Sequence, residues 1–334
     1  MITLLTPQNN TQVSLQTEQQ RDFIFWDVHR TLSKDPWDIP VMKQKQSEKD
    51  DFSVPAPVEF SWEGDASSYT LLISECEDLS SPIKIEVSEN KASVYNLCIG
   101  RTYYWAVASQ NDVSQTFSFN TAWDIPRFIK IDGMTNIRDL GGYKIPGGRI
   151  KQGLLYRSAE VEYATPDGIK TILDLGIKTE IELRFEEYES DRGSVLEAHG
   201  VAHKKLPIHA YGGCFSEPAK PFVKQIFEIL ADESNYPVLF HCAAGADRTG
   251  SIAFLVEAVL GVYYKQMRTD YELTCLSTTG NRTRNEKDAA WGLQYLEELC
   301  VGDNWQELVY DFLTRIVGIS PETIESMRRI LTAK

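Results

Sequence analysis

The chain has 334 residues, of which 42% are hydrophobic and 25% charged, an ordinary composition for a folded protein long enough to form two domains. Its formal net charge of −14 argues against binding to nucleic acid or to an anionic membrane surface, because both need a basic face. No stretch reaches the roughly 18 to 20 uncharged apolar residues that a transmembrane helix requires.

The six cysteines are scattered without metal-binding spacing such as Cys-x-x-Cys. We therefore expect no metal site and no cofactor. The first ten residues lack the charged and apolar regions of a signal peptide, which predicts a cytoplasmic protein. A secreted or periplasmic location is the alternative, if a leader has been removed from the chain.

The first third of the chain carries short alternating apolar runs separated by turn residues, a pattern typical of an antiparallel β-sandwich. The predicted strands are residues 58–62, 69–74, 92–97, 104–108 and 116–120. Residues 97–107 look like the late strands of a fibronectin type III domain, with Trp62 as the expected core tryptophan. The polar stretch 28–51 is predicted to be a long loop between early strands. We thus predict an immunoglobulin/fibronectin III-like domain over residues 1–122, with a protein or a glycan as its candidate partner.

From residue 123 to residue 334 the pattern changes to alternating strands and helices, which predicts an α/β domain. Strands are expected at about 154–157, 179–184, 202–207 and 236–241. Helices are expected at 166–175, 217–232, 249–260, 262–274, 287–299, 304–317 and 320–331. The predicted architecture is a central, mostly parallel sheet flanked by helices, with a helical C-terminal half.

Residues 240–250 read Phe-His-Cys-Ala-Ala-Gly-Ala-Asp-Arg-Thr-Gly, a Cys-x5-Arg loop between a predicted strand and a predicted helix. Unpaired N–H groups at a helix N-terminus favour a bound oxyanion and also a thiolate. Cys242 is therefore the candidate nucleophile, and the planar guanidinium of Arg248 can hold two phosphoryl oxygens at once. By average residue usage, such a pattern arises by chance on the order of once in ten thousand chains of this length.

The remaining loop residues have predicted tasks in the same chemistry. Thr249 can donate its hydroxyl to the sulfur of Cys242. Small residues let the backbone turn its amides toward an anion. These candidate phosphate-binding residues are Ala243, Ala244, Gly245 and Ala246.

The loop resembles the signature of cysteine-dependent phosphatases, the protein tyrosine phosphatase superfamily. Three further blocks resemble the bacterial tyrosine/serine protein phosphatase family, over roughly residues 123–334. They read Asn136-Ile-Arg-Asp-Leu-Gly-Gly-Tyr143, Gly153-Leu-Leu-Tyr-Arg-Ser158 and Ile181-Glu-Leu-Arg184. The resemblance implies a phosphocysteine intermediate on Cys242. It also implies that His241 is buried and tunes the thiol through hydrogen bonds.

Within these blocks, Arg138 and Asp139 could form a pair that braces the floor of the site. Arg157 or Arg184 could contact the loop or the substrate, although for each arginine taken singly a structural ion pair is the favoured role. Ala246 stands where many relatives have lysine. The missing cation favours phosphoprotein monoesters over phosphoinositides or inositol phosphates.

Hydrolysis also needs a general acid, because an alkoxide or phenoxide leaves poorly without a proton. Asp247 is the first candidate, since the family resemblance implies an acid within the loop. Its alternative role is that of a structural carboxylate anchoring an N–H group or an arginine. His209 and Glu217 are the alternative acids.

These observations favour a metal-independent phosphomonoester hydrolase, a protein-tyrosine or dual-specificity phosphatase acting on a phosphorylated protein or a small phosphomonoester. A phosphoinositide or inositol phosphate phosphatase and a non-catalytic module for phosphorylated ligands are the alternatives. The presence of both Cys242 and Arg248 argues against the binding module. A rhodanese-like sulfurtransferase or an arsenate reductase is disfavoured by Arg248-Thr249 closing the loop and by the block that starts at Asn136.

Overall fold

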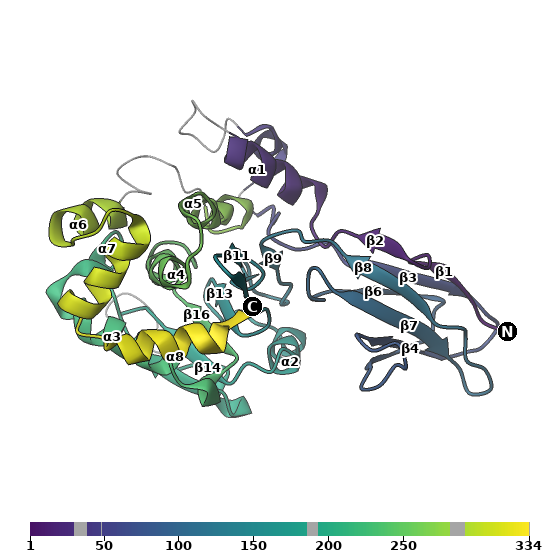
Figure 1. Ribbon diagram of the computed structural model, residues 1–334. Helices are drawn as coiled ribbons and strands as arrows, with labels where there is room; N and C mark the ends of the chain where they lie inside the picture. Colours follow the sequence, from purple (N-terminus) through teal and green to yellow (C-terminus); the bar gives the residue numbers. More distant parts are fainter. Residues whose placement is uncertain (30–38, 48, 186–192, 281–290, 334) are drawn as a thin grey trace. The chain divides into compact units, whose positions relative to one another are not determined.

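The computed structural model of the chain describes residues 1–29, 39–47, 49–185, 193–280 and 291–333. The chain forms two compact units, and each unit is made of two separate stretches of sequence (Figure 1). The first unit contains Met1–Thr17 and Pro55–Arg127, and the second contains Glu18–Val54 and Phe128–Lys334.

The first unit consists of two β-sheets. The strands are β1 (Thr3–Thr6), β2 (Thr11–Val13), β3 (Val58–Glu63), β4 (Tyr69–Ser74), β5 (Ile83–Val87), β6 (Lys91–Val94), β7 (Thr102–Ala108) and β8 (Phe117–Thr121). One sheet has the order β2-β8-β7-β4-β5 and the other has the order β1-β3-β6. Neighbouring strands are antiparallel except for β2 and β8, which are parallel. The five strands predicted from alternation are confirmed.

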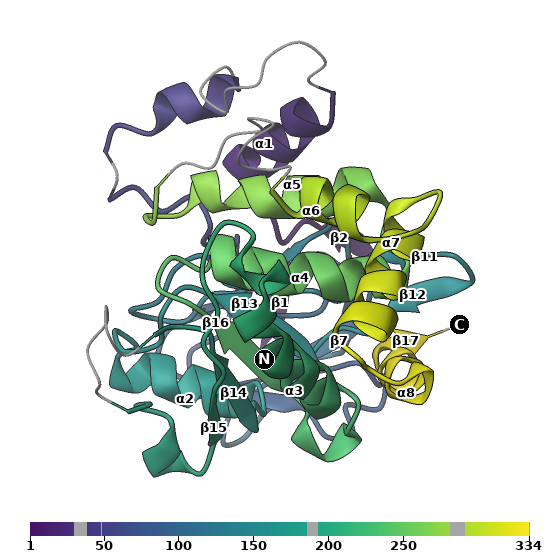
Figure 2. The ribbon, with the colours of Figure 1, turned by 90° about the vertical axis from the view of Figure 1, so that its left-hand side faces the viewer.

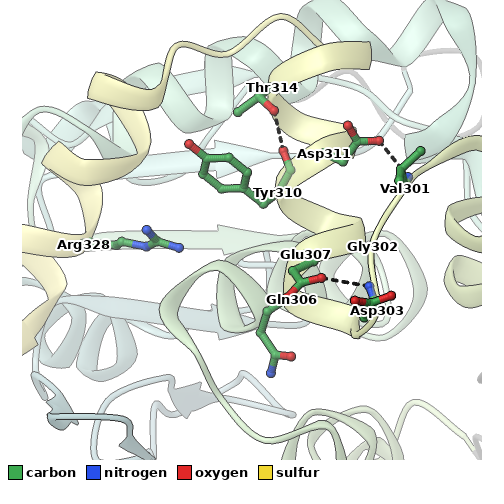
Figure 3. Close-up of a pocket in the computed structure, with 9 residues that line it drawn as sticks. All are labelled: Val301, Gly302, Asp303, Gln306, Glu307, Tyr310, Asp311, Thr314 and Arg328. Carbon is green, nitrogen blue, oxygen red and sulfur yellow. Dashed lines mark hydrogen bonds between the residues drawn. The ribbon is translucent and has the colours of Figure 1, made fainter.

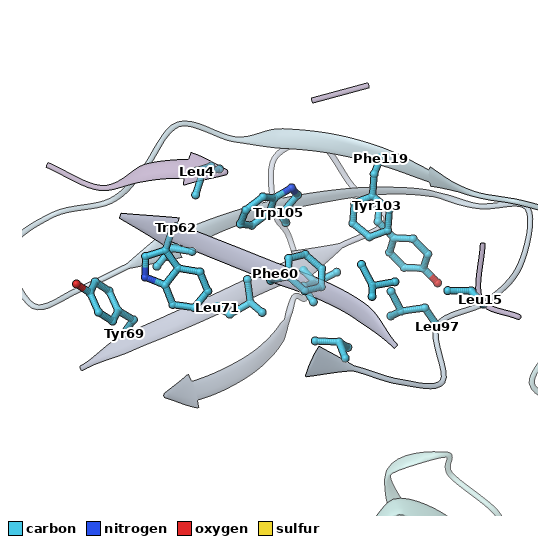
Figure 4. Close-up of a cluster of buried hydrophobic side chains, with 14 of the residues drawn as sticks. Leu4, Leu15, Phe60, Trp62, Tyr69, Leu71, Leu97, Tyr103, Trp105 and Phe119 are labelled. Carbon is cyan, nitrogen blue, oxygen red and sulfur yellow. The ribbon is translucent and has the colours of Figure 1, made fainter. Parts of the chain in front are cut away.

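A single aromatic core lies between these two sheets (Figure 4). Alternation along β3 turns Phe60 and Trp62 inward, since successive side chains of a strand point to opposite faces. Trp62 is only 2% exposed, which confirms it as a core tryptophan. Its ring packs edge-on against Tyr69, and Phe60 does the same against Trp105 of the other sheet.

The second unit is built around a six-stranded sheet of order β15-β14-β16-β13-β10-β9. The first four of these strands are mutually parallel, and β10 is antiparallel to β13. The sheet strands are β9 (Arg127–Phe128), β10 (Arg138–Asp139), β13 (Leu155–Ser158), β14 (Thr179–Glu182), β15 (Ala202–Lys205) and β16 (Val238–His241). A small separate sheet joins β11 (Lys144–Ile145), β12 (Gly148–Ile150) and β17 (Thr332–Ala333). The predicted, mostly parallel α/β architecture is confirmed.

The α-helices that follow in this unit are α2 (Pro166–Asp174), α3 (Lys220–Leu230), α4 (Asp247–Leu260), α5 (Tyr264–Glu272), α6 (Trp291–Leu299), α7 (Trp305–Asp311) and α8 (Pro321–Leu331). Short turns of 3-10 helix are η4 (Glu197–His199), η5 (Gly213–Phe215), η6 (Glu217–Ala219), η7 (Glu233–Asn235) and η8 (Leu273–Leu276), and a π-helical turn, η9 (Phe312–Ile316), follows α7. All the predicted helices are found, although residues 287–290 of one of them lie outside the described residues. No helix among the described residues is long and apolar enough to cross a membrane.

Two helix starts follow directly from local sequence. Thr165 caps α2 by accepting a hydrogen bond from the N–H of Gly168, and Ser320 caps α8 in the same way. A proline follows each cap, at a position whose missing N–H costs the helix nothing.

Strand alternation also decides which face of the sheet carries the side chains that support the loop. Tyr156 of β13 packs with Ile172 of α2 and with Leu239 of β16 on one face. The next residue, Arg157, points to the opposite face, where α4 lies against β13 and β16. The helix α4, which begins at the end of the loop, therefore lies on the face of the sheet away from α2 (Figure 2).

The division of the chain differs from the predicted domains, 1–122 and 123–334, in the segment Glu18–Val54. This segment contains α1 (Glu18–His29) and the 3-10 helix η2 (Pro40–Gln44), where a long loop of the first domain was predicted. Residues 30–38 of that predicted loop lie outside the described residues. The reason for the difference is apolar burial, because Phe23, Val41 and Met42 pack with Leu273 and other residues of the second unit.

Candidate active site

The loop with the predicted nucleophile connects β16 to α4. The strand β16 is an inner one of the four parallel strands, with β14 on one side and β13 on the other. Cys242 follows the last residue of β16 and is 2% exposed, and Arg248 is partly exposed in the first turn of α4. Ligands of open α/β sheets bind at this edge, beyond the carboxyl ends of the strands. The candidate nucleophile and the candidate cationic side chain thus both lie at the N-terminal end of α4, where the sequence predicted them.

The loop turns its carbonyl groups outward. Four of them accept hydrogen bonds: Ala243 O from Glu160 N at 3.1 Å, Ala244 O from Asn136 Nδ2 at 2.9 Å, Gly245 O from Arg157 Nη2 at 2.7 Å, and Ala246 O from Gly250 N at 2.6 Å. In a trans peptide the N–H after each carbonyl points the opposite way. Among the described residues, the N–H groups of residues 243–246 donate to no protein acceptor. The loop is thus an open cradle of amides suited to an oxyanion.

Only glycine fits at position 245. Its φ is +64°, and a Cβ placed there would lie 2.4 Å from the carbonyl carbon and oxygen of Ser158 at the end of β13. The loop therefore packs directly against the end of the neighbouring strand β13.

A buried ion-pair network supports the loop from below. Asp270 of α5 accepts from Nε of Arg138 at 2.9 Å and also pairs with Nη1 of Arg157, and all three side chains are at most 1% exposed. Burial alone would raise the pKa of Asp270, but the two guanidinium groups hold it below its usual value. Since Arg157 also binds Gly245 O, the network ties the loop to α5.

Glu257, on α4, lies in the same buried region, and its Oε1 has no hydrogen-bond partner among the described residues. Burial raises the pKa of Glu257 well above its usual value, and the charge of Asp270 raises it further. Burial thus favours the neutral form of Glu257. With Glu257 in this form, two guanidinium charges and one carboxylate charge leave a net positive charge beneath the loop, which favours an anion above it.

Arg138 and Asp139 do not form the predicted pair, because consecutive residues of a strand point to opposite faces. Asp139 instead accepts hydrogen bonds from the N–H groups of Gly141 and Gly153, both at 2.7 Å. These two residues are supports of the site. Their predicted contact with phosphate is corrected accordingly.

The prediction that Arg184 contacts phosphate is also corrected. Its guanidinium binds Glu182 at 2.8 Å and Glu160 at 3.0 Å, and it pairs with Glu162 as well. Three carboxylates therefore neutralise this charge, and the side chain is only 4% exposed. Arg184 has the structural ion-pair role that was favoured from the sequence for each arginine taken singly.

His241 is fully buried behind the nucleophile, and its Nε2 lies 2.8 Å from Oε1 of Glu180 on β14. Burial alone would raise the pKa of Glu180, but the hydrogen bonds from His241 and Ser194 hold it below its usual value. The negative carboxylate fixes the orientation of the imidazole ring. Sequence reasoning missed Glu180, although a charged residue inside a predicted buried strand was the available signal.

Asp247 is 8% exposed in the first turn of α4, and its Oδ1 accepts a hydrogen bond from the hydroxyl of Tyr271 at 3.0 Å. Tyr271 was also missed, because nothing in the predicted helix 262–274 marked it. Thr249 is fully buried, and no acceptor lies within hydrogen-bonding reach of its Oγ1 among the described residues. The predicted donation from Thr249 to the sulfur of Cys242 is therefore not formed.

The two alternative acids have other surroundings. His209 is exposed and its ring stacks on Phe185 with the ring centres 4.2 Å apart. The side chain of Glu217 is 84% exposed and pairs with Lys220 at 2.5 Å. Within the part of the chain that the structure describes, neither residue forms a hydrogen bond with the loop.

A pocket elsewhere in the second unit lies at α7 and α8 (Figure 3). Two of its lining residues, Gln306 and Arg328, bind the carbonyl groups of Val262 and Val259 near the C-terminal end of α4. The loop is at the opposite end of this helix, about 20 Å away at 1.5 Å per residue. This pocket is therefore separate from the cradle.

Comparison with known proteins identifies the second unit. A family model described as "Tyrosine phosphatase family" matches residues 129–333, which is more than half of the chain. A tyrosine-protein phosphatase of Nostoc commune is 25% identical over 156 residues, covering 41% of this chain and 53% of that protein. A candidate tyrosine-protein phosphatase of Cupriavidus necator is 27% identical over 171 residues, covering 43% of this chain and 61% of that protein. The chain thus spans between about half and three fifths of the length of these two relatives.

Solved structures give a weaker likeness. The catalytic core of Siw14 matches with a TM-score of 0.37 and 15% identity, covering 56% of this chain and 96% of that chain. The core catalytic domain of the PP-IP phosphatase SIW14 from S. cerevisiae, in complex with citrate, matches with a TM-score of 0.30 and 16% identity, covering 48% and 85%. Both TM-scores are too low to say anything further about this chain.

Replacing Asp270 with Asn should strongly destabilise the second unit, because it leaves two buried arginines without a countercharge. We expect a loss of about 3 to 5 kcal/mol in its free energy of unfolding. Urea unfolding can be followed by pulse labelling of the buried Cys275 thiol, which reports on this unit alone. Asp174→Asn, which breaks an exposed pair with Lys170, is the control and should change stability by less than about 0.5 kcal/mol. Equal losses in the two variants would contradict the proposed network.

Replacing Glu257 with Gln should stabilise the second unit at neutral pH but not at acidic pH. The folded-state pKa is raised, so wild type loses stability as pH rises above the unfolded value of about 4.3, because only the unfolded state ionises. The stability of the variant relative to wild type should increase by up to about 1.4 kcal/mol per pH unit. The same labelling assay between pH 4 and pH 8 measures this difference. A difference that is constant across that range would show that Glu257 ionises in the folded protein.

Proposed function

This chain belongs to the tyrosine phosphatase family, and on that premise we propose that it is a metal-independent phosphomonoester hydrolase. Its substrate is a phosphotyrosine protein, or with dual specificity a phosphoserine or phosphothreonine protein. The observation that carries the proposal is the amide cradle, which joins Cys242 to Arg248 at the N-terminus of α4. A thiolate and an anion-binding site in one loop suit phosphoryl transfer to sulfur.

In the first step, the Cys242 thiolate attacks phosphorus and the bond from phosphorus to the ester oxygen breaks. Asp247 gives its proton to the leaving oxygen, while Arg248 and the inward amides hold the equatorial phosphoryl oxygens. In the second step, water attacks the phosphocysteine and gives a proton to the Asp247 carboxylate. The sulfur–phosphorus bond breaks, and inorganic phosphate and the thiolate are released.

Asp247 is favoured as the general acid because it lies at the end of the loop, in the first turn of α4, and the hydroxyl of Tyr271 orients its Oδ1. His209 and Glu217 are disfavoured by their exposure and their other contacts. In the second step, Thr249 is assigned to donate a hydrogen bond to the sulfur of Cys242 as the sulfur–phosphorus bond breaks. Its buried hydroxyl has no other acceptor among the described residues, so donation to a developing thiolate would satisfy it.

A substrate with a single phosphate is favoured over an inositol polyphosphate or a phosphoinositide. Ala246 brings no cation to the loop and is fully buried, so a long basic side chain has no room there. The charge of Arg184 is neutralised by Glu160, Glu162 and Glu182. Within the described part of the loop, Arg248 supplies the cationic contact to the phosphoryl group.

For the first unit we propose a fibronectin type III-like sandwich that binds a protein or a glycan. The two sheets with one aromatic core support this assignment. Such a module positions an enzyme on its substrate more often than it takes part in the chemistry.

Cys242→Ser should abolish phosphate release. Wild type and variant are compared without metal on a phosphotyrosine peptide, a phosphoserine peptide, a phosphoinositide and inositol hexakisphosphate. We expect turnover of the phosphotyrosine peptide that falls by a factor of about 10⁴ or more in the variant. Cys300→Ser changes a thiol far along the chain from the loop and should leave turnover unchanged. Preference for the phosphoinositide would replace the proposed substrate class, and vanadate binding without turnover of any substrate would favour the non-catalytic module.

Asp247→Asn should slow reactions according to the leaving group. With a phosphotyrosine peptide, whose phenoxide needs a proton, we expect a loss of about 10²- to 10⁴-fold in kcat. With p-nitrophenyl phosphate, whose leaving group needs little protonation, the loss should be much smaller. His209→Ala and Glu217→Gln are the controls. A loss that depends on the leaving group in either control, and not in Asp247→Asn, would move the acid to that residue.

A further inference from the structure

The segment Glu18–Val54 belongs to the second unit although it lies outside the residues that match the family, 129–333. Figures 1 and 2 both show α1 beside α5, and the two helices are in contact. The end of the segment is fixed by hydrogen bonds. The N–H of Phe52 donates to Leu276 O at 2.7 Å, and Nε2 of Gln20 donates to the carbonyl groups of Phe52 and Val54, both at 2.9 Å.

Close to this end, the carboxylate of Asp51 organises a small hydrogen-bond network. Its Oδ1 accepts from the hydroxyl of Ser53 at 2.5 Å and from the N–H of Ser53 at 2.9 Å. Its Oδ2 accepts from the hydroxyl of Thr135 at 2.5 Å. The proton of the Ser53 hydroxyl is therefore directed to Asp51, which leaves the oxygen of Ser53 free to act as an acceptor.

The Ser53 oxygen accepts a hydrogen bond from the N–H of Asn136 at 3.2 Å. Asn136 is fully buried and has a φ of +58°, in the left-handed region that residues other than glycine seldom occupy. A backbone in that region persists only where its surroundings hold it. Ser53 supplies one of the contacts that hold it, and it caps an N–H that would otherwise be buried without a partner.

Asn136, held in this conformation, in turn binds the loop. Its Nδ2 donates to Ala244 O at 2.9 Å and to the hydroxyl of Thr274 at 3.1 Å. Holding Ala244 O outward turns the N–H of Gly245 inward, because the two groups of a trans peptide point in opposite directions. Thr279 also donates to Ala244 O, at 3.0 Å.

A second contact from the segment Glu18–Val54 supports Thr279, the second donor to Ala244 O. Nζ of Lys45 donates to Cys275 O at 3.1 Å and also to Ser277 O, and the hydroxyl of Ser277 lies 2.8 Å from that of Thr279. Both donors that hold Ala244 O outward are thus connected to the segment Glu18–Val54.

We propose that Asp51 and Ser53 are positioning residues of the phosphate cradle, acting through Asn136 on the peptide between Ala244 and Gly245. The inference rests on the proposed function, in which this cradle holds the transferred phosphoryl group. It adds a part of the chain that the family match does not contain. The catalytic unit therefore depends on residues that precede most of the first unit in the sequence.

The test compares Ser53→Ala with Asp50→Asn in the full chain. Asp50 is a matched control, because it lies in the same segment and caps the exposed N–H groups of Gln46 and Ser47, away from Asn136. Cys242 is alkylated with iodoacetate, an anion, and with iodoacetamide, its neutral analogue. The ratio of the two rates reports the anion preference of the cradle and is insensitive to a general loss of stability.

We expect Ser53→Ala to lower this ratio about 10-fold, to weaken vanadate binding about 10- to 100-fold, and to lower kcat for the phosphotyrosine peptide by a similar factor. Asp50→Asn should change each quantity less than about 2-fold. Asn136→Gly accepts the left-handed φ but removes the donor to Ala244. In that background, Ser53→Ala should have less than about a 3-fold effect, since the two residues act through one contact.

The results separate this inference from the proposed function. If wild type turns over the peptide while Ser53→Ala and Asp50→Asn give equal ratios and vanadate affinities, the positioning role is overturned and the phosphatase stands. The same holds if Ser53→Ala has its full effect in the Asn136→Gly background. If wild type turns over no substrate while Ser53→Ala alone lowers the alkylation ratio, the positioning role stands and the proposed catalysis fails.

Discussion

A loop that presents its amides to an anion must find partners for the carbonyl groups it turns away. Buried backbone polar groups without partners cost free energy comparable to a lost hydrogen bond, so these partners are a condition for the cradle to exist. Here the donors come from five places in the chain: Asn136, Arg157, Glu160, Thr279 and α4 itself. The rest of the second unit can be understood as the scaffold that brings these donors to one loop.

The same donors also set the electrostatics of the site. Arg157 donates to Gly245 O and, together with Arg138, pairs with Asp270. Its guanidinium thus fixes the loop and also contributes positive charge beneath it. Because burial raises the pKa of Glu257 and so favours its neutral form, these buried side chains together favour a net positive charge close beneath the cradle. A chain with a formal charge of −14 can therefore hold an anion locally. The overall charge constrains its partners, while the oriented groups around the loop determine what the site binds.

The sequence was most informative where the residues of one site lie close together in the chain. Cys242, Gly245 and Arg248 lie within one short stretch of sequence, residues 242–248. The alternation of strands and helices around this stretch predicted the parallel sheet. The supports could not be predicted, because Glu180, Asp270 and Tyr271 reach the loop only through folding. Arg184 was assigned to phosphate because its three carboxylate partners are brought together only in the folded chain. The segment Glu18–Val54 was assigned to the wrong unit since its polar composition concealed the few apolar residues that decide its packing.

Several departures from ordinary local structure lie close to this one site. Asn136 and Gly245 both have positive φ, and among the described residues the buried Oγ1 of Thr249 and Oε1 of Glu257 have no hydrogen-bond partner. Each of these features costs stability, of the order of 1 to 3 kcal/mol for a strained backbone or an unsatisfied polar group. A fold selected for stability alone would remove them, for example with an apolar residue at position 257. Their presence in the loop, along α4 and just before β10 indicates that the second unit gives up stability to keep its amides and its sulfur ready for an anion.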